Sequence, residues 1–162
     1  MSGAPGTPDR SPATPRPQAL ASPTVTIDIR ELRPGDEELL GRAISLFRDA
    51  EPVASDLFLE DPRTHAFVAI DGEDPVGWCF GYELFRPEGR WMMLLYGIDV
   101  VEVRRREGVG RQLLDAFVEL ARSKGHQKMW LLTDAGNEAA RRLYEGAGGD
   151  ATQKLGYWWV FG

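Results

Sequence analysis

Three strand-like segments that follow one another along the chain are the strongest constraint on its fold. Residues 65–70, 76–85 and 90–100 are rich in apolar and aromatic residues, and clusters of Asp, Gly, Pro and Glu at 71–75 and 86–89 separate them. Connections this short join antiparallel neighbours. The three segments therefore predict an antiparallel meander in the middle of the chain.

Helical spacing of apolar residues and further strand patterns surround this meander. Together they predict the order β-α-α-β-β-β-α-β-α-β, with no internal repeat. Besides the meander, the expected elements are strands at 24–30, 127–133 and 157–161 and helices around 39–47, 55–60, 109–124 and 137–146.

The composition fits one domain without a metal, a disulfide or a membrane span. A chain of 162 residues can bury about 68–70% of its unfolded surface, which is enough for one core. Its one cysteine, Cys79, cannot form an internal disulfide, and one cysteine with two histidines is too few for a closed zinc site. The longest apolar run, residues 91–98, is far shorter than the ~20 residues of a membrane helix, so we expect no membrane partner.

The first 23 residues differ in composition from the rest. They hold six of the eleven prolines and lack the apolar stretch of a secretory signal. We expect a disordered, Pro-rich leader over 1–23 on a cytoplasmic protein, followed by one domain over 24–162. The leader has a net charge of +1, so the domain carries −7 when the whole chain carries −6. This is either ordinary solubilising charge or a preference for a cationic partner, and it disfavours nucleic acid.

A glycine-containing segment lies between the last strand of the meander and the long helix that follows. Arg104, Arg105 and Arg106 precede Gly108 and Gly110, where the first N–H groups of the helix have no intrahelical partner. Glycine backbone, the positive end of a helix and nearby arginines together suit a phosphate group. The alternatives are a tight turn and a solvated arginine loop. Neither a Walker A motif nor a dinucleotide-binding fingerprint fits.

A second motif follows on the last expected helix, with Asn137, Ala140, Leu143 and Tyr144 in register. Together with Arg105-x-x-Gly108-x-Gly110, it resembles the two signatures of the GNAT superfamily of N-acetyltransferases. The resemblance covers residues 24–162. It implies an α+β fold of the α/β sandwich type, with a mixed, mostly antiparallel sheet of six to seven strands and about four helices. It also implies acetyl-CoA as co-substrate.

The resemblance assigns residues to the binding of acetyl-CoA. In this family the glycine signature holds the pyrophosphate of coenzyme A. A glycine inside an apolar strand, here Gly97, is typical of a bulge, and the family's bulge frees N–H groups that hold the pantetheine arm and polarise the thioester carbonyl. The expected cofactor-binding residues are Ile98, Asp99, Val100, Arg105, Arg106, Glu107, Gly108, Val109, Gly110, Arg111, Asn137 and Tyr144.

The same resemblance predicts direct attack by an amine that must first lose a proton. Asp99 and Asp134 are the candidate proton acceptors, and Tyr144 takes the family's role of general acid toward the departing thiolate. Alternatives remain open: Asp134 or Asn137 can cap a helix, Asp99 can cap its loop, and Tyr144 can simply pack on the sheet. Glu83 and Glu102 are weaker candidates that we expect at the surface. The glutamate base of many protein-acetylating members corresponds to Leu94 here.

Within the superfamily, the chain looks most like the gentamicin-type aminoglycoside 3-N-acetyltransferases, over residues 96–110 and again from Asp134 to Tyr144. The aspartate that follows their strand tyrosine is Gly97 here, and Asp99 stands two residues later. We therefore expect acetylation of a small cationic amine, such as an aminoglycoside, with antibiotic resistance as its consequence. The alternatives are a protein N-terminus, a lysine or a metabolite amine, and an inactive acetyl-CoA-binding module.

The remaining chemically active residues have simpler interpretations. Cys79 lies in an apolar strand and is expected to be inert core. His65 and His126 bracket elements and are expected at the surface or at strand edges. The apolar run 157–161 is expected to be mostly core, with one face lining either the substrate cleft or the contact of a homodimer.

Overall fold

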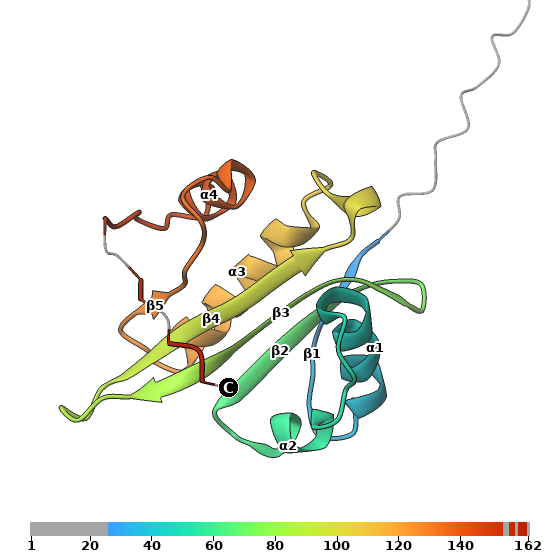
Figure 1. The fold of residues 1–162 in the computed structure, drawn as a ribbon, viewed down its shortest axis with the longest axis horizontal. Helices are drawn as coiled ribbons and strands as arrows, with labels where there is room; N and C mark the ends of the chain where they lie inside the picture. The colour runs from blue at the N-terminus through green and yellow to red at the C-terminus, as the bar shows by residue number, and fades with distance from the viewer. Residues whose placement is uncertain (1–25, 154–155, 158, 162) are drawn as a thin grey trace, which may run out of the picture.

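A computed structural model describes residues 26–153, 156–157 and 159–161 of the chain (Figure 1). The expected leader and the first two residues of the first expected strand lie outside the described residues. The elements are β1 (Asp28–Glu31), α1 (Glu37–Arg48), α2 (Ser55–Glu60), β2 (Thr64–Asp71), β3 (Asp74–Phe85), β4 (Trp91–Val100), the 3-10 helix η1 (Glu102–Arg104), α3 (Val109–Ser123), β5 (Met129–Trp130) and α4 (Glu138–Gly146).

The strands form one sheet in the order β1-β2-β3-β4-β5. Neighbours from β1 to β4 are antiparallel, as the meander predicts, whereas β5 runs parallel to β4. The α+β class and the mixed sheet are confirmed. The described residues form a 5-stranded sheet, so the expected count of six to seven strands was too high.

The difference lies in the last two expected strands. Of residues 127–133, only Met129–Trp130 pairs with β4. Trp158 lies outside the described residues, and the rest of 157–161 has no strand structure. These residues were expected to be mostly core, yet they are 72–94% exposed. A strand needs a neighbour for its N–H and C=O groups, and apolar sequence alone does not show that a neighbour is present.

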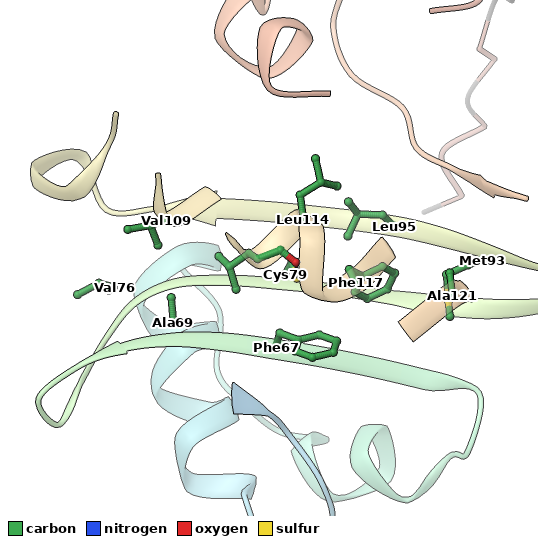
Figure 2. Packing of buried hydrophobic residues seen from close by; sticks show 11 residues of the cluster. Phe67, Ala69, Val76, Cys79, Met93, Leu95, Val109, Leu114, Phe117 and Ala121 are labelled. Atoms are coloured by element: carbon green, nitrogen blue, oxygen red, sulfur yellow. Dashed lines mark hydrogen bonds between the residues drawn. The ribbon is translucent and has the colours of Figure 1, made fainter. Parts of the chain in front are cut away.

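Helices cover both faces of the sheet (Figure 1). α3 packs on one face, where Cys79, Leu113 and Phe117 are fully buried; Figure 2 shows this cluster between the strands and the helix. α1 and α2 cover the other face, over a cluster that includes Val68 and Trp78. No helix in the described ranges is long and apolar enough to cross a membrane.

Candidate active site

The loop from η1 into α3 exposes a run of backbone donors. Between Arg106 and Arg111 no N–H group makes a hydrogen bond of good geometry to any described residue, and the first bonded donor of α3 is Gln112, 3.0 Å from the Gly108 oxygen. Gly108 has φ +85°, and a Cβ at this position would meet nothing within 4 Å. Because these donors precede a 15-residue helix, whose N-terminus carries partial positive charge, the loop can hold an anion.

The arginines around this loop differ in the contacts that their guanidinium groups make. Arg104 forms ion pairs with Asp71 and with Glu107, so its charge is already paired. The Nε of Arg105 donates to the Val100 oxygen at 3.2 Å. Arg106 is exposed and has a positive φ of 65°. Of the predicted triplet, Arg105 and Arg106 therefore form no ion pair with a described residue, and their charges are available to a ligand.

Two other predicted cofactor residues contribute backbone rather than side chain. The Val109 side chain is 1% exposed and belongs to the core. Arg111 binds Asp115 through Nε at 2.8 Å and donates from Nη1 to the Gly146 oxygen at 2.8 Å. Its side chain thus joins α3 to the end of α4, while the backbone N–H groups of both residues have no partner among the described residues.

The bulge expected at Gly97 is present in β4. Phe80 of β3 pairs with Gly97, and the next residue, Gly81, pairs with Leu95, so Tyr96 is an extra residue in β4. β5 pairs with β4 only at Met93 and Leu94. Beyond this point, β4 has no strand on that side among the described residues.

The free edge of β4 faces away from β3. The N–H group of Val101 donates to the Val76 oxygen at 2.9 Å, on the β3 side. Because successive residues of a strand alternate in the direction of their backbone groups, Val100 and Ile98 direct theirs to the free edge. This edge begins beside the bulge and ends at the loop with the unbonded donors.

Tyr144 and Asp99 approach the same region from different elements. Tyr144 lies on α4, which packs on the α3 cluster through Leu143, Tyr144 and Ala147. Burial raises the pKa of the Tyr144 phenol above its ordinary value of 10.0, and the negative charge of Asp99 raises it further. The phenol is therefore protonated at neutral pH and can act as a proton donor.

Asp99 has defined partners on the opposite side. Its Oδ2 accepts a hydrogen bond from Trp78 Nε1 at 3.1 Å and lies 3.7 Å from Arg48 Nη2. The carboxylate is half-exposed. Asp99 therefore contacts the aromatic face of β3, and its negative charge also acts on the Tyr144 phenol.

Asp134 and Asn137 lie in the turn before α4. The Asn137 Oδ1 accepts from the Ala140 N–H at 3.1 Å, which makes Asn137 the helix cap. The capping alternative is thus observed for Asn137 and not for Asp134. Asp134 is exposed, and within the described part of the chain its carboxylate has no hydrogen bond or ion pair. Its role as a proton acceptor stays a prediction.

A cleft of about 770 Å³ opens next to the bulge, between the end of α1, the segment leading into α2 and β3 and β4. Its walls include Phe58, Phe80, Tyr82 and Tyr96, and Arg48 lies in it. Sequence reasoning missed these residues. The signal was the aromatic alternation at Trp78, Phe80 and Tyr82, which places the three side chains on one face of a strand.

A second hollow, of about 1080 Å³, lies between α1, α2 and the start of β3. Its lining includes Glu38, Arg42 and Ser55 and none of the predicted site residues. The lining of the aromatic cleft does not include the predicted site residues either, but two of its members, Trp78 and Arg48, lie against the Asp99 carboxylate.

Glu83, His65 and His126 were expected at the surface or at strand edges, but their side chains are only 3–10% exposed. Glu83 Oε1 lies 2.7 Å from His65 Nε2 and 2.5 Å from Lys124 Nζ, and Glu83 Oε2 lies 2.9 Å from His126 Nε2. Burial would raise the pKa of Glu83, but its hydrogen bonds to Lys124 and His65 lower it overall. Charged groups can be buried when they are paired, and sequence does not reveal such pairing.

Cys79 is core, as expected. It is fully buried, and burial raises the pKa of its thiol. A thiol held in this state is not a nucleophile.

A bulged strand with a free edge, beside an anion-binding helix start and a phenol, defines a protein of the acyl-CoA-dependent acyltransferase class. The model of the acetyltransferase (GNAT) family matches residues 29–148, and the chain belongs to this family. A Bacillus subtilis (strain 168) protein, the uncharacterized N-acetyltransferase YycN, is 32% identical over 117 residues, which cover 71% of this chain and 70% of the relative. Enzymes of this family use acetyl-CoA as acetyl donor, and the chain is an acetyltransferase of this kind.

Two solved structures show the same fold. The aminoglycoside acetyltransferase meta-AAC0020 from an uncultured soil metagenomic sample, in complex with trehalose, has a TM-score of 0.76 at 19% identity and covers 83% of this chain and 95% of its own. The aminoglycoside N-acetyltransferase AAC(6')-Iy in complex with CoA has a TM-score of 0.72 at 20% identity. The alignment covers 87% of this chain and 99% of the AAC(6')-Iy chain. At these identities the likeness concerns the fold alone.

Proposed function

We propose that the chain transfers an acetyl group from acetyl-CoA to the primary amine of a small cationic acceptor. The ammonium group of this acceptor must lose a proton before the nitrogen can attack the thioester. The observation that carries this proposal is the arrangement around β4. The free edge of the strand leads from the bulge to the unbonded N–H groups, Tyr144 packs on the α3 face, and the aromatic cleft opens beside the bulge on the α1 face.

The residues that would hold acetyl-CoA are mostly backbone donors. The N–H groups of residues 106 to 111 bind the diphosphate, and Arg106 adds a charge. The N–H groups of Ile98 and Val100 bind the pantetheine amides, because they lie at the free edge of the strand. Asn137 uses its Oδ1 for the helix cap, so only its side-chain NH₂ group contacts the ligand.

Acetyl-CoA supplies an activated thioester when it is bound, and the chain supplies the proton transfers. Asp99 accepts a proton from the ammonium group of the acceptor, directly or through a water molecule. Tyr144 donates a proton to the leaving thiolate. The attack needs no covalent enzyme intermediate, since Cys79 is buried as a neutral thiol. Asp134 is the alternative proton acceptor if the turn before α4 approaches the substrate.

The acceptor has two candidate classes. The names of two solved structures with this fold, and the gentamicin-type pattern over residues 96–110, support an aminoglycoside and hence a role in antibiotic resistance. A metabolite amine is the second candidate. The charge of Arg48 inside the cleft favours it, because a guanidinium repels a polycation. We further propose that the reaction takes place in the cytoplasm, and a homodimer through the exposed residues 157 and 159–161 is compatible with both classes.

The test is a thiol-release assay with acetyl-CoA and a panel of aminoglycosides, polyamines, amino acids and peptides. We expect release that depends on one class of amine. Isothermal titration measures acetyl-CoA binding separately. Binding without turnover on any amine would favour an inactive acetyl-CoA-binding module, and the absence of binding would remove the proposal.

A further inference from the structure

Arg48 is the one cation among the lining residues of the aromatic cleft, and its hydrogen-bonding capacity is unused by the residues that the structure describes. Its guanidinium lies over the rings of Trp78 and Phe80, 5.5 Å and 5.3 Å from their centroids. Its nearest charged partner is Asp99 Oδ2 at 3.7 Å, which is beyond hydrogen-bonding distance. A guanidinium has N–H donors in a planar fork that matches a carboxylate. These donors are therefore available to a ligand.

The bulge fixes the place of this guanidinium. A Cβ at Gly97 would collide with Arg48 Nη2 and lie 2.8 Å from Phe80 Cε1. Glycine at this position leaves the space that the guanidinium fills. The cation thus lies directly at the kink in β4, where we place the reacting amine.

Arg48 and Asp99 present opposite charges side by side. A molecule that carries an ammonium group and a carboxylate on one carbon presents the opposite pair at a similar spacing. Such a molecule can direct its carboxylate to Arg48 and its ammonium group to Asp99. The nitrogen then lies between the cleft and the Tyr144 side of β4, as acetyl transfer requires.

The rest of the cleft selects the side chain. Phe58, Phe80, Tyr82 and Tyr96 form edge-on or tilted pairs with centroids 5.4–6.2 Å apart. Of the acidic residues in the lining, Asp61 is already bound by Arg63 at 2.8 Å, which leaves Glu51. Besides Asp99, one unpaired carboxylate offers little to a polycation, whereas the aromatic walls suit an apolar group.

We infer that the acceptor is an α-amino acid with an apolar or aromatic side chain; this inference rests on the proposed function. In the reaction a C–N bond forms at the α-nitrogen and the C–S bond of the thioester breaks. The ammonium group loses two protons. One proton leaves through Asp99 to solvent. Tyr144 gives its own proton to the thiolate, and the second proton of the ammonium group restores the protonated phenol.

The experiment compares kcat/KM for L-phenylalanine and for phenethylamine, which lacks only the carboxylate. We expect L-phenylalanine to be preferred by about tenfold or more, the value of a charge-assisted hydrogen bond. In Arg48→Gln this ratio falls toward one, and in Arg48→Lys it is partly kept. Arg122→Gln on α3, where the Arg122 side chain is 73% exposed, is the matched control and keeps the wild-type ratio. Circular dichroism shows whether the variants are folded.

When the protein turns over an amine, three outcomes overturn the inference. They are a preference for phenethylamine, a ratio that Arg48→Gln leaves unchanged in the folded protein, and acetylation of an aminoglycoside or polyamine but of no amino acid. The last outcome keeps the proposed function. Absence of turnover on every amine also overturns the inference, and acetyl-CoA titration then shows whether the proposed function has failed as well.

Discussion

Tyr144 and Asp99 are the residues in which the proposed chemistry is concentrated. They are far apart in the sequence and lie on different elements, yet the charge of Asp99 raises the pKa of Tyr144. We expect Tyr144→Phe to lower kcat by about 10²–10⁴-fold, because the thiolate loses its proton donor. The affinity for acetyl-CoA should change little. Steady-state kinetics and isothermal titration measure the two effects, and an unchanged kcat would remove Tyr144 from the mechanism.

The coupling between these two residues can be measured directly. The negative charge of Asp99 opposes ionisation of the phenol, so its removal in Asp99→Asn should lower the pKa of Tyr144 toward its ordinary value of 10.0. Tyrosinate absorbance against pH gives this pKa when Tyr144→Phe serves as the blank. A pKa that stays the same or rises in Asp99→Asn would place the two groups too far apart to cooperate.

Sequence predicts the residues of this site that lie in a motif and misses those that depend on distant neighbours. Gly108 and Gly110 are recognisable because their spacing in the loop between β4 and α3 is fixed, and Tyr144 is recognisable because it lies seven residues after Asn137 in a second motif on α4. Arg48 and Glu83 give no such signal. Their surroundings are made by elements brought together only in the folded chain.

At the scale of elements, the β3–β4 pair is held in its register by glycine. A Cβ at Gly81 would collide with the Leu94 backbone oxygen and lie 2.7 Å from Phe117 Cζ. Since neither the strand nor the buried ring can yield easily, we expect Gly81→Ala to destabilise the fold by about 3 kcal/mol or more. Gly146→Ala, where nothing lies within 4 Å, is the control. Urea denaturation of both variants measures the difference, and equal stabilities would contradict this account of the bulge.

Glu83 connects β2, β3 and the end of α3 through His65, Lys124 and His126. Its pKa is lowered in the folded state, so its contribution to stability is complete above the unfolded pKa of about 4.3 and is lost as pH falls through the folded pKa. We expect Glu83→Gln to cost roughly 1–3 kcal/mol at pH 7, and the cost should fall as the pH is lowered below 4. Urea midpoints at the two pH values test this, and a cost independent of pH would show that the ion pairs are not responsible.

The elements themselves are predicted well where the pattern is long. The meander, α2 and α3 lie within a few residues of their expected bounds. The failure at 127–133 has a physical cause. Apolar residues indicate that a segment can form a strand, but β5 stops pairing with β4 after Leu94. The local sequence pattern does not predict where this pairing ends.

At the scale of the whole molecule, the sheet places two kinds of surface side by side. Backbone donors line the β4 edge and the start of α3, and aromatic side chains line the cleft at the other side of the bulge. The first surface suits a phosphorylated donor and the second an apolar acceptor. Motifs in the sequence point to the first surface, whereas the second depends on packing between α1, α2 and β3.

The central claim is that the N–H groups ahead of α3 bind the diphosphate of acetyl-CoA, and one pair of variants tests it. Asp and Asn both tolerate a positive φ, and the space beside Gly108 is open, so Gly108→Asp and Gly108→Asn should fold alike and differ only in charge. Isothermal titration should show acetyl-CoA binding to Gly108→Asp about tenfold more weakly than to Gly108→Asn, because a carboxylate repels the diphosphate. Equal affinities would contradict the claim.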